Sequence, residues 1–597
     1  MYRAHNVIRE DRSDGAVILR SGYTLSPVAR CSGEWLDHWA GSTPDAVFLA
    51  ERDGAGWRSL SYSETRQIVR TIAAGLLARG MNQKTPILII SGNSVNHALL
   101  SLAAQYVGVP TAPVAEQYAL IPGARPQLLH CAGLVKPAMV YAEDMERFGD
   151  ALSESVFDTV EKVVSRGAAE GVTDFATLLE RHETDMAQVD AAAAAVGPDT
   201  VAKYLLTSGS TSSPKAVITT QRMMCANQAQ ILDALPFLRT RPPRIVDWLP
   251  WNHVFGGSHN VNMMLSNGGA LYIDAGKPVQ PLVQKTIENN QLVGGTLAFN
   301  VPVGFAMLRD AMKEDEALRN RYFSELDMLF YAGASLPQDV WADLEAMARD
   351  VRGDMPLFTS SWGLTETAPA CLIQHEPTDM SGIIGVPMTG VEVKLLPDEG
   401  GRFEIRVRGP NVMPGYLDDP EKTAAAFDEE GYFITGDAVR FVDESDLTKG
   451  LKFDGRVSED FKLQSGTWVR AAMLRLELLT ALGPLAQDVV LCGEGRNELG
   501  LMVIPTADAR AMADDEEDVL LGSGLHDALR DRLGDQSGKG SSMRIARVMV
   551  LAEPPSIGDG EITAKGNLNA RKVQTRRAAL VERLYGDTDP GVLNLLR

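Results

Sequence analysis

The stretch KYLLTSGSTSSPKAVITT, Lys203–Thr220, sets an apolar strand before a loop of hydroxyls and small residues. Tyr204–Leu206 is the expected strand, and it leads directly into the loop Thr207–Lys215. Such a loop exposes backbone N–H groups beside side-chain hydroxyls, and together with Lys215 it can grip an oligophosphate. A Ser/Thr-rich surface turn is the alternative, but the strand before the loop and the lysine within it favour phosphate binding. The pattern G-x-x-x-x-G-K followed by Ser or Thr is absent, which argues against an ordinary P-loop ATPase or kinase.

Strands and helices alternate along the chain on both sides of this loop. Ser61-x-x-Glu64 has the form of a capping box, and apolar residues then recur at helical spacing. The further expected elements are a helix at Ala98–Tyr106 and strands at Pro86–Ile90, Val109–Val114, Arg244–Leu249 and Met328–Ala332. This order predicts an α/β fold in which helices cover a parallel sheet.

The chain changes character towards its C-terminus. Prolines and glycines punctuate an alternating strand at Gly400–Gly415, so we expect a small β-rich subdomain there. After Gly455 we expect a separate α+β unit with strands at Val489–Cys492, Leu499–Ile504 and Arg547–Leu551. The predicted organisation is therefore a large N-terminal α/β domain, residues 1–455, and a small C-terminal domain, residues 456–597.

The composition is that of a globular protein, with 597 residues of which 45% are hydrophobic and 23% are charged. The formal net charge of −21 argues against binding nucleic acid or an anionic membrane, because both require a basic face. The five cysteines are scattered and form no C-x-x-C pair, which favours reduced thiols in a cytoplasmic protein. No apolar run approaches the roughly 18 residues that a membrane span needs. The sequence leaves the oligomeric state open, a homodimer included.

Further motifs follow the loop along the chain. They are Leu249–Gly256, Tyr331–Leu336, Ser361–Glu366, Gly385–Pro387, Arg408–Pro410 with Gly415–Tyr416, Gly431–Asp437 and Gly455–Arg456. In this order, and over nearly the whole chain, they resemble the motifs of acyl-CoA synthetases of the acyl-adenylate-forming superfamily. In the loop, Ser212 and Ala216 replace two glycines of the family pattern.

This resemblance implies an enzyme that uses ATP and Mg²⁺ to convert a carboxylic acid into an acyl-AMP, and then transfers the acyl group to coenzyme A. It also implies a mobile C-terminal domain that serves the two steps in different orientations. A carboxylate that attacks the α-phosphorus of ATP brings two anions together, so such a site must neutralise charge and align the attack.

The resemblance implies roles at the nucleotide for individual residues. The residues that would hold the β- and γ-phosphates are Thr207, Ser208, Gly209, Ser210, Thr211 and Lys215. Those that would frame the adenine are Gly333, Ala334, Ser335, Trp362 and Gly363. Thr365 would bond the α-phosphate, and Glu366 would coordinate Mg²⁺. Asp437 would accept from the ribose hydroxyls, with Arg456 assisting. Taken singly, Glu366 fits a helix-start carboxylate and Asp437 a turn residue, so these roles depend on the joint order of the motifs.

In the C-terminal domain the resemblance implies a hinge two residues after Arg456, which here is Ser458 in place of the usual Asp or Lys. Lys462 and Gly466 resemble a stretch near the coenzyme A arm. The catalytic lysine of the family follows a glycine in a T-x-x-G-K pattern, and aligning the glycines puts Asn567 at that position. We therefore expect Lys565, two residues earlier, to act in adenylation, with Lys572 as the alternative.

For the acid we expect a pocket lined by residues around His253–Asn260, Ala298–Gly304, Tyr331 and Thr359–Trp362. The residues singled out are His253, which would face the carboxylate, and Phe255, Gly256, Phe299 and Tyr331. Taken alone, His253 also fits a packed, hydrogen-bonded histidine. The flat apolar walls suit an aryl or cinnamyl acid and equally a fatty chain. Asp14–Ser21, Trp251–Gly257, Ser266–Gly269 and Glu459–Trp468 further resemble bacterial feruloyl-CoA synthetases.

We therefore expect a hydroxycinnamate–CoA ligase that acts on ferulate, coumarate or caffeate. One alternative is a ligase for benzoate-like or medium-chain acids, and a second is an adenylate former that passes its product to a carrier protein. A third is a non-catalytic nucleotide- or acyl-binding protein that has lost its lysine, which only Asn567 supports.

Overall fold

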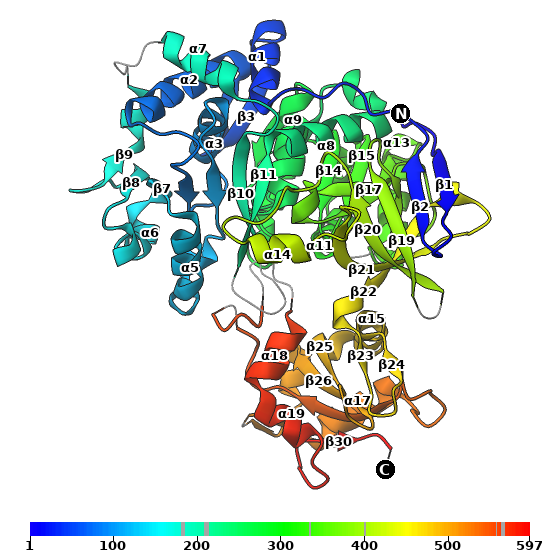
Figure 1. Ribbon diagram of the computed structural model, residues 1–597. Helices are drawn as coiled ribbons and strands as arrows, with labels where there is room; N and C mark the ends of the chain where they lie inside the picture. The colour runs from blue at the N-terminus through cyan, green and yellow to red at the C-terminus, as the bar shows by residue number, and fades with distance from the viewer. Residues whose placement is uncertain are drawn as a thin grey trace.

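The structure is a computed structural model that describes residues 1–180, 186–207, 214–333, 336–398, 401–516, 518–556, 558–562 and 568–596. A large α/β body carries a smaller unit, coloured orange to red in Figure 1, that is formed by the C-terminal part of the chain. This confirms the expected fold class. The domain boundary between Gly455 and Arg456 stays a prediction; strand β22 (Leu451–Arg456) of the large body runs across it.

The first sheet has seven strands and includes the two strands that flank the loop Thr207–Lys215. Its order is β11-β10-β6-β5-β7-β8-β9, parallel except for the antiparallel hairpin of β10 and β11. Its strands are β5 (Ile87–Ile89), β6 (Thr111–Pro113), β7 (Met139–Asp144), β8 (Glu161–Arg166), β9 (Thr173–Asp174), β10 (Val201–Thr207) and β11 (Lys215–Thr220). The helices α2 (Tyr62–Ala78), α3 (Val95–Tyr106) and α5 (Arg125–Val135) pack on its faces. The Ser61–Glu64 capping box that opens α2 is confirmed.

The second sheet has eleven strands in the order β1-β2-β19-β20-β21-β22-β18-β17-β16-β15-β14. The strands besides β22 are β1 (Val7–Asp11), β2 (Val17–Ser21), β14 (Leu297–Asn300), β15 (Met328–Tyr331), β16 (Leu357–Gly363), β17 (Ala370–Gln374), β18 (Ile383–Pro387), β19 (Glu392–Asp398), β20 (Arg402–Arg408) and β21 (Phe433–Phe441). Strands β14 to β16 are parallel, and β16 pairs with β17 in the antiparallel sense. The expected β-rich part around Gly400–Gly415 is present, because β20 lies among the antiparallel strands β1, β2, β19, β21 and β22. These strands continue through β18 and β17 into the parallel part of the same sheet.

Strand β15 shows how the parallel part of this sheet is buried on both faces. Met328 and Phe330 join the central core, whereas Leu329 and Tyr331 join a separate core under the helices α11 (Pro302–Glu314), α12 (Glu316–Phe323) and α13 (Gln338–Arg352). Since successive residues of a strand point to opposite faces, the two faces of β15 belong to different environments.

Beside β14 lies a four-stranded sheet of β12 (Arg244–Asp247), β13 (Ala270–Ile273), β3 (Val47–Asp53) and β4 (Gly56–Ser61).

The C-terminal unit has a sheet and a core of its own. The sheet order is β25-β26-β29-β30, with β25 (Ala486–Cys492), β26 (Leu499–Pro505), β29 (Ile545–Val550) and β30 (Leu593–Asn594). It packs against α15 (Ala471–Leu482), α17 (Ser523–Leu533), α18 (Ala570–Arg576) and α19 (Ala578–Leu584). All five cysteines of the chain are buried free thiols. Among the described residues, none of the helices has the length and apolar composition that a membrane crossing requires.

Candidate active site

Strand β16 ends in a turn that leaves no room for a side chain at Gly363. A Cβ atom there would lie 1.8 Å from the carbonyl oxygen of Pro369. The chain then forms the single turn η6 (Thr365–Thr367), which places the buried Thr365 and the adjacent Glu366 at the carboxyl end of the parallel strands. In open α/β sheets this end is where ligands bind.

Asp437 on β21 is buried between β16 and β22. Its Oδ2 accepts a hydrogen bond from Trp362 Nε1 at 2.9 Å, and Arg456 Nε lies 3.4 Å from its Oδ1. Among the described residues, nothing donates a hydrogen bond to Oδ1, although this atom is buried. Burial raises the pKa of Asp437 to about 6, against the opposing effect of Arg456. The site therefore holds one carboxylate oxygen in place and leaves the other available as an acceptor.

Tyr416 connects the loop strand with the end of β16. Its hydroxyl donates to Glu366 Oε1 at 3.1 Å, and Lys215 Nζ lies 4.2 Å from the centre of its ring. Val217 of β11 pairs with Tyr416 in an isolated bridge. Thr207 Oγ1, at the end of β10, is buried without a hydrogen-bond partner among the described residues. A cation, a carboxylate and a hydroxyl acceptor thus gather near one tyrosine, to which the sequence analysis gave no role.

Several predicted residues lie outside the described residues. They are Ser208, Gly209, Ser210, Thr211, Ala334, Ser335, Asn567 and the proposed catalytic Lys565. The segment around Lys565 is held on both sides, since Ile562 pairs with Leu568 and the Asn569 amide donates to the Glu561 carbonyl at 2.8 Å. Glu561 and Arg577 form a buried ion pair of 2.7 Å. The two ends of residues 563–567 are therefore fixed to the C-terminal unit.

The π-helical turn η5 (Phe255–Asn260) follows His253 and presses against the preceding backbone. A Cβ atom would lie 2.4 Å from the Leu249 carbonyl oxygen at Gly256 and 2.1 Å from the Trp251 carbonyl oxygen at Gly257. π-helical turns of this kind are frequent at functional sites. At the start of the turn, the Phe255 amide donates a hydrogen bond to Nδ1 of the preceding His253 at 3.3 Å.

The turn η5 carries one wall of an aromatic cluster. The ring of Phe255 lies 6.1 Å from that of Phe299 and 5.7 Å from that of Phe330. His259, which lies in the predicted stretch His253–Asn260, completes the cluster, whereas Phe330 was not predicted. Tyr331 is not brought together with these rings, because it points to the opposite face of β15, where it packs on Trp341. An all-apolar strand carries no pattern that tells which of its residues faces the site.

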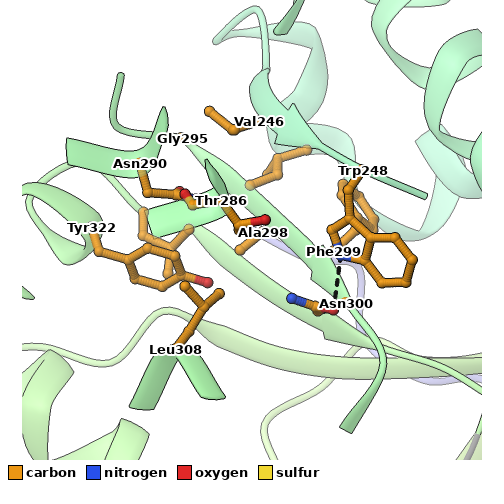
Figure 2. A pocket seen from close by; sticks show the side chains of 12 residues that line it. Val246, Trp248, Thr286, Asn290, Gly295, Ala298, Phe299, Asn300, Leu308 and Tyr322 are labelled. Atoms are coloured by element: carbon orange, nitrogen blue, oxygen red, sulfur yellow. Dashed lines mark hydrogen bonds between the residues drawn. The ribbon is translucent and has the colours of Figure 1, made fainter. Parts of the chain in front are cut away.

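A small pocket lies elsewhere, between strands β12 and β14 and the helices α10 (Val283–Leu292), α11 and α12 (Figure 2). At its edge Trp248 Nε1 donates to Asn300 Oδ1 at 3.1 Å. Of the predicted site residues it includes only Phe299. We therefore do not assign it to the site at the strand ends.

A family model described as AMP-binding enzyme matches residues 36–417, which is well over half of the chain. The chain belongs to the AMP-binding enzyme family. It is 29% identical over 459 residues to 3-[(3aS,4S,7aS)-7a-methyl-1,5-dioxo-octahydro-1H-inden-4-yl]propanoyl:CoA ligase of Rhodococcus jostii strain RHA1, covering 73% of this chain and 84% of the relative. It is 26% identical over 463 residues to 4-coumarate–CoA ligase of Pinus taeda, covering 75% and 80%. The structure of O-succinylbenzoate coenzyme A synthetase of Bacillus subtilis in complex with AMP is similar with a TM-score of 0.67 at 17% identity, covering 90% and 98%.

In this AMP-binding enzyme the connection to the C-terminal unit passes through η8 (Val457–Glu459), which includes the predicted hinge residue Ser458. Lys462 lies on β23 (Phe461–Lys462), which pairs with β24 (Trp468–Val469), and its Nζ is 4.7 Å from the centre of the Trp468 ring. Gly466 stands in the turn between the two strands with φ +83°. Lys462 and Gly466 therefore share one exposed hairpin, and their role towards coenzyme A stays a prediction.

The burial of Asp437 can be tested through the stability of the protein. Because a tenfold change in proton affinity equals about 1.4 kcal/mol, raising the pKa from 3.8 to about 6 costs the ionised form about 3 kcal/mol. The folded state binds the proton more tightly than the unfolded state, so this penalty appears as pH rises from about 4 to 6. We expect Asp437→Asn, which imitates the protonated form, to raise the free energy of unfolding by up to about 3 kcal/mol at pH 8 and little at pH 4.5.

Urea unfolding of both proteins at the two pH values measures this difference. A variant that is less stable at pH 8 would contradict it, since the pair with Arg456 would then outweigh the cost of burying the charge.

Proposed function

We propose that the protein is an ATP-dependent acid–CoA ligase that forms an acyl-AMP and then an acyl-CoA, with release of pyrophosphate and AMP. The observation that carries the proposal is the Asp437 carboxylate, which has one oxygen fixed by Trp362 and the other buried without a hydrogen-bond donor. The two hydroxyls of a ribose supply such donors. Relatives that are named as CoA ligases support the acyl transfer to coenzyme A.

The chemistry assigns work to the groups at the strand ends. The carboxylate oxygen of the acid bonds to the α-phosphorus of ATP as the bond to pyrophosphate breaks, and the thiol of coenzyme A later displaces AMP. Lys215 offsets charge on the phosphates, and Thr365 donates to the α-phosphate. Glu366 offers oxygen ligands that suit Mg²⁺, which would neutralise phosphate charge when bound. Since Mg²⁺ usually takes one or two carboxylates plus substrate phosphates, the single Glu366 carboxylate fits this demand.

For the acid we propose a hydroxycinnamate, bound with its ring against Phe255, Phe299 and Phe330. These rings form an apolar and uncharged wall, which favours an aromatic acid over one with a second carboxylate. The relative from Pinus taeda is named for 4-coumarate, and the four sequence stretches that resemble feruloyl-CoA synthetases point the same way. A ligase for benzoate-like or medium-chain acids is the alternative, because the same wall accepts both.

Pyrophosphate release with ATP and Mg²⁺ tests the reaction and the acid together. The acids would be ferulate, coumarate, caffeate, benzoate, octanoate and acetate, each with and without coenzyme A. We expect turnover with the three hydroxycinnamates that depends on coenzyme A. Turnover with benzoate or octanoate alone would leave the ligase reaction standing and reject the hydroxycinnamate, whereas no pyrophosphate from any acid would reject the reaction.

The adenylation lysine is tested by Lys565→Ala. Because the side chain would meet the negative charge of the transferring phosphoryl group, we expect acyl-AMP formation to fall by about 100-fold or more. Thioester formation from supplied acyl-AMP should remain. Lys572→Ala is the matched control, since Lys572 is the next lysine along the chain and lies on α18 (Ala570–Arg576). If Lys572→Ala lost adenylation and Lys565→Ala did not, the assignment would pass to Lys572.

The C-terminal unit meets the large domain in a close backbone contact between Gly558 and Gly123. Gln127 Nε2 also donates to the Gly558 carbonyl at 3.1 Å, and Lys565 follows seven residues later. A Cβ atom at Gly558 would lie 2.9 Å from the Gly123 carbonyl carbon. We propose that this contact holds the orientation in which the segment of Lys565 serves adenylation.

We expect Gly558→Val to slow pyrophosphate release by about tenfold while sparing thioester formation from supplied acyl-AMP, because overpacking typically costs about 1–3 kcal/mol. Gly538→Val is the control, since nothing lies within 4 Å of a Cβ atom there. Equal loss of both steps in Gly558→Val would indicate a folding defect and not a shift in orientation.

A further inference from the structure

His259 is a fully buried polar ring among phenyl groups. It is 1% exposed, and its ring centre lies 5.5 Å from that of Phe255, 5.6 Å from that of Phe299 and 5.2 Å from that of Phe330. A buried imidazole needs a hydrogen-bond partner for each nitrogen, because an unsatisfied buried polar atom costs about 1–3 kcal/mol. The three phenyl rings supply neither a strong donor nor an acceptor.

The hydrogen bonds behind His259 decide which nitrogen carries the proton. Asp247 Oδ2 accepts from Asn260 Nδ2 at 3.0 Å, and Asp247 Oδ1 accepts from the Leu249 amide at 3.3 Å. With its amide nitrogen turned to Asp247, Asn260 presents Oδ1 to His259 Nδ1 at 2.9 Å. An amide oxygen only accepts, so Nδ1 must be the protonated nitrogen. Burial lowers the pKa of His259 to about 4, and the ring is therefore neutral.

The other nitrogen of His259 is then a lone-pair acceptor. Nε2 is buried and has no hydrogen-bond partner among the described residues. Burial raises the pKa of Asp247 to about 7, so at pH 8 this carboxylate is ionised and can only accept hydrogen bonds. The hydrogen bonds from His259 to Asn260 and from Asn260 to Asp247 therefore keep one direction. The group that is missing opposite Nε2 is consequently a hydrogen-bond donor. A methoxy oxygen or a second carboxylate does not meet this demand, whereas a phenolic hydroxyl does.

We propose that His259 Nε2 accepts a hydrogen bond from a ring hydroxyl of the acid and thereby selects hydroxylated aromatic acids over their unsubstituted analogues. The proposal rests on the acid–CoA ligase function above and adds the residue that reads the ring substituent. Phe255, Phe299 and Phe330 provide the flat walls, and His259 provides the one polar atom that fixes orientation among them. Since Nε2 is closed off from solvent, the ring of the acid reaches it as the aromatic side chains move apart.

The test is the ratio of kcat/KM for 4-coumarate to that for cinnamate at pH 8, because the two acids differ only in the ring hydroxyl. We expect the wild type to favour 4-coumarate by about tenfold or more, as a site with a buried unpaired polar atom rejects the analogue that lacks the partner. His259→Phe, which keeps a ring of similar shape, should bring the ratio close to one, mainly by raising KM for 4-coumarate. His259→Gln should restore part of the preference, because its amide oxygen also accepts.

Phe330→Leu is the matched control for repacking of the cluster, and it should change both acids by the same factor and leave the ratio unchanged. Thermal unfolding of each variant separates loss of fold from loss of selectivity. A wild type that does not distinguish the two acids, or a His259→Phe variant that keeps the wild-type ratio, would overturn the role of His259 alone. Turnover with octanoate but with neither aromatic acid would overturn this role and leave the ligase reaction intact. No thioester from any acid would reject the proposed function itself.

Discussion

A buried carboxylate joins the two halves of the eleven-stranded sheet. Asp437 stands opposite Arg456 in the register of β21 and β22, and Trp362 reaches it from β16, where parallel pairing changes to antiparallel pairing. Its charge is unfavourable at this depth, and only the indole N–H and the guanidinium offset that cost. The register of β21 and β22 therefore places Asp437 beside Arg456 and within reach of Trp362 on β16. The turn that holds Thr365 and Glu366 follows directly after β16.

The turn η5, which carries one side of the aromatic cluster, depends on close backbone contact. Gly256 and Gly257 let the turn η5 lie directly on the carbonyl groups of Leu249 and Trp251. That contact brings η5 over the face of the sheet on which Phe299 and Phe330 are register partners in β14 and β15. The aromatic cluster is thus built from two glycines on one side and from strand pairing on the other.

Sequence patterns of short range predicted the structure well, and relations across long range did not follow from them. The capping box at Ser61 and the strand around Ile87–Ile89 are local, and both are confirmed. The β-rich part around Gly400–Gly415 was predicted, but only the distant partners of β20 show that it continues the sheet that holds the parallel strands. Tyr331 was expected where Phe330 lies, since an apolar strand that is buried on both faces has no alternation to read. The stretch His253–Asn260 was predicted to line the pocket, but His259 was not singled out within it, because its significance comes from Asn260 and Asp247, which act together only in the fold.

The proposed catalytic Lys565 lies between two anchored parts of the C-terminal unit. The pairing of Ile562 with Leu568 and the Glu561–Arg577 ion pair hold both sides of residues 563–567 to the C-terminal unit. Two residues span at most about 7 Å, so position 565 is a short distance along the chain from position 567. Lysine carries its charge on a flexible four-carbon stem, which can make up such a distance. The Gly558–Gly123 contact, which joins the C-terminal unit to the large domain, is therefore proposed to matter more for adenylation than the exact position of the lysine in the chain.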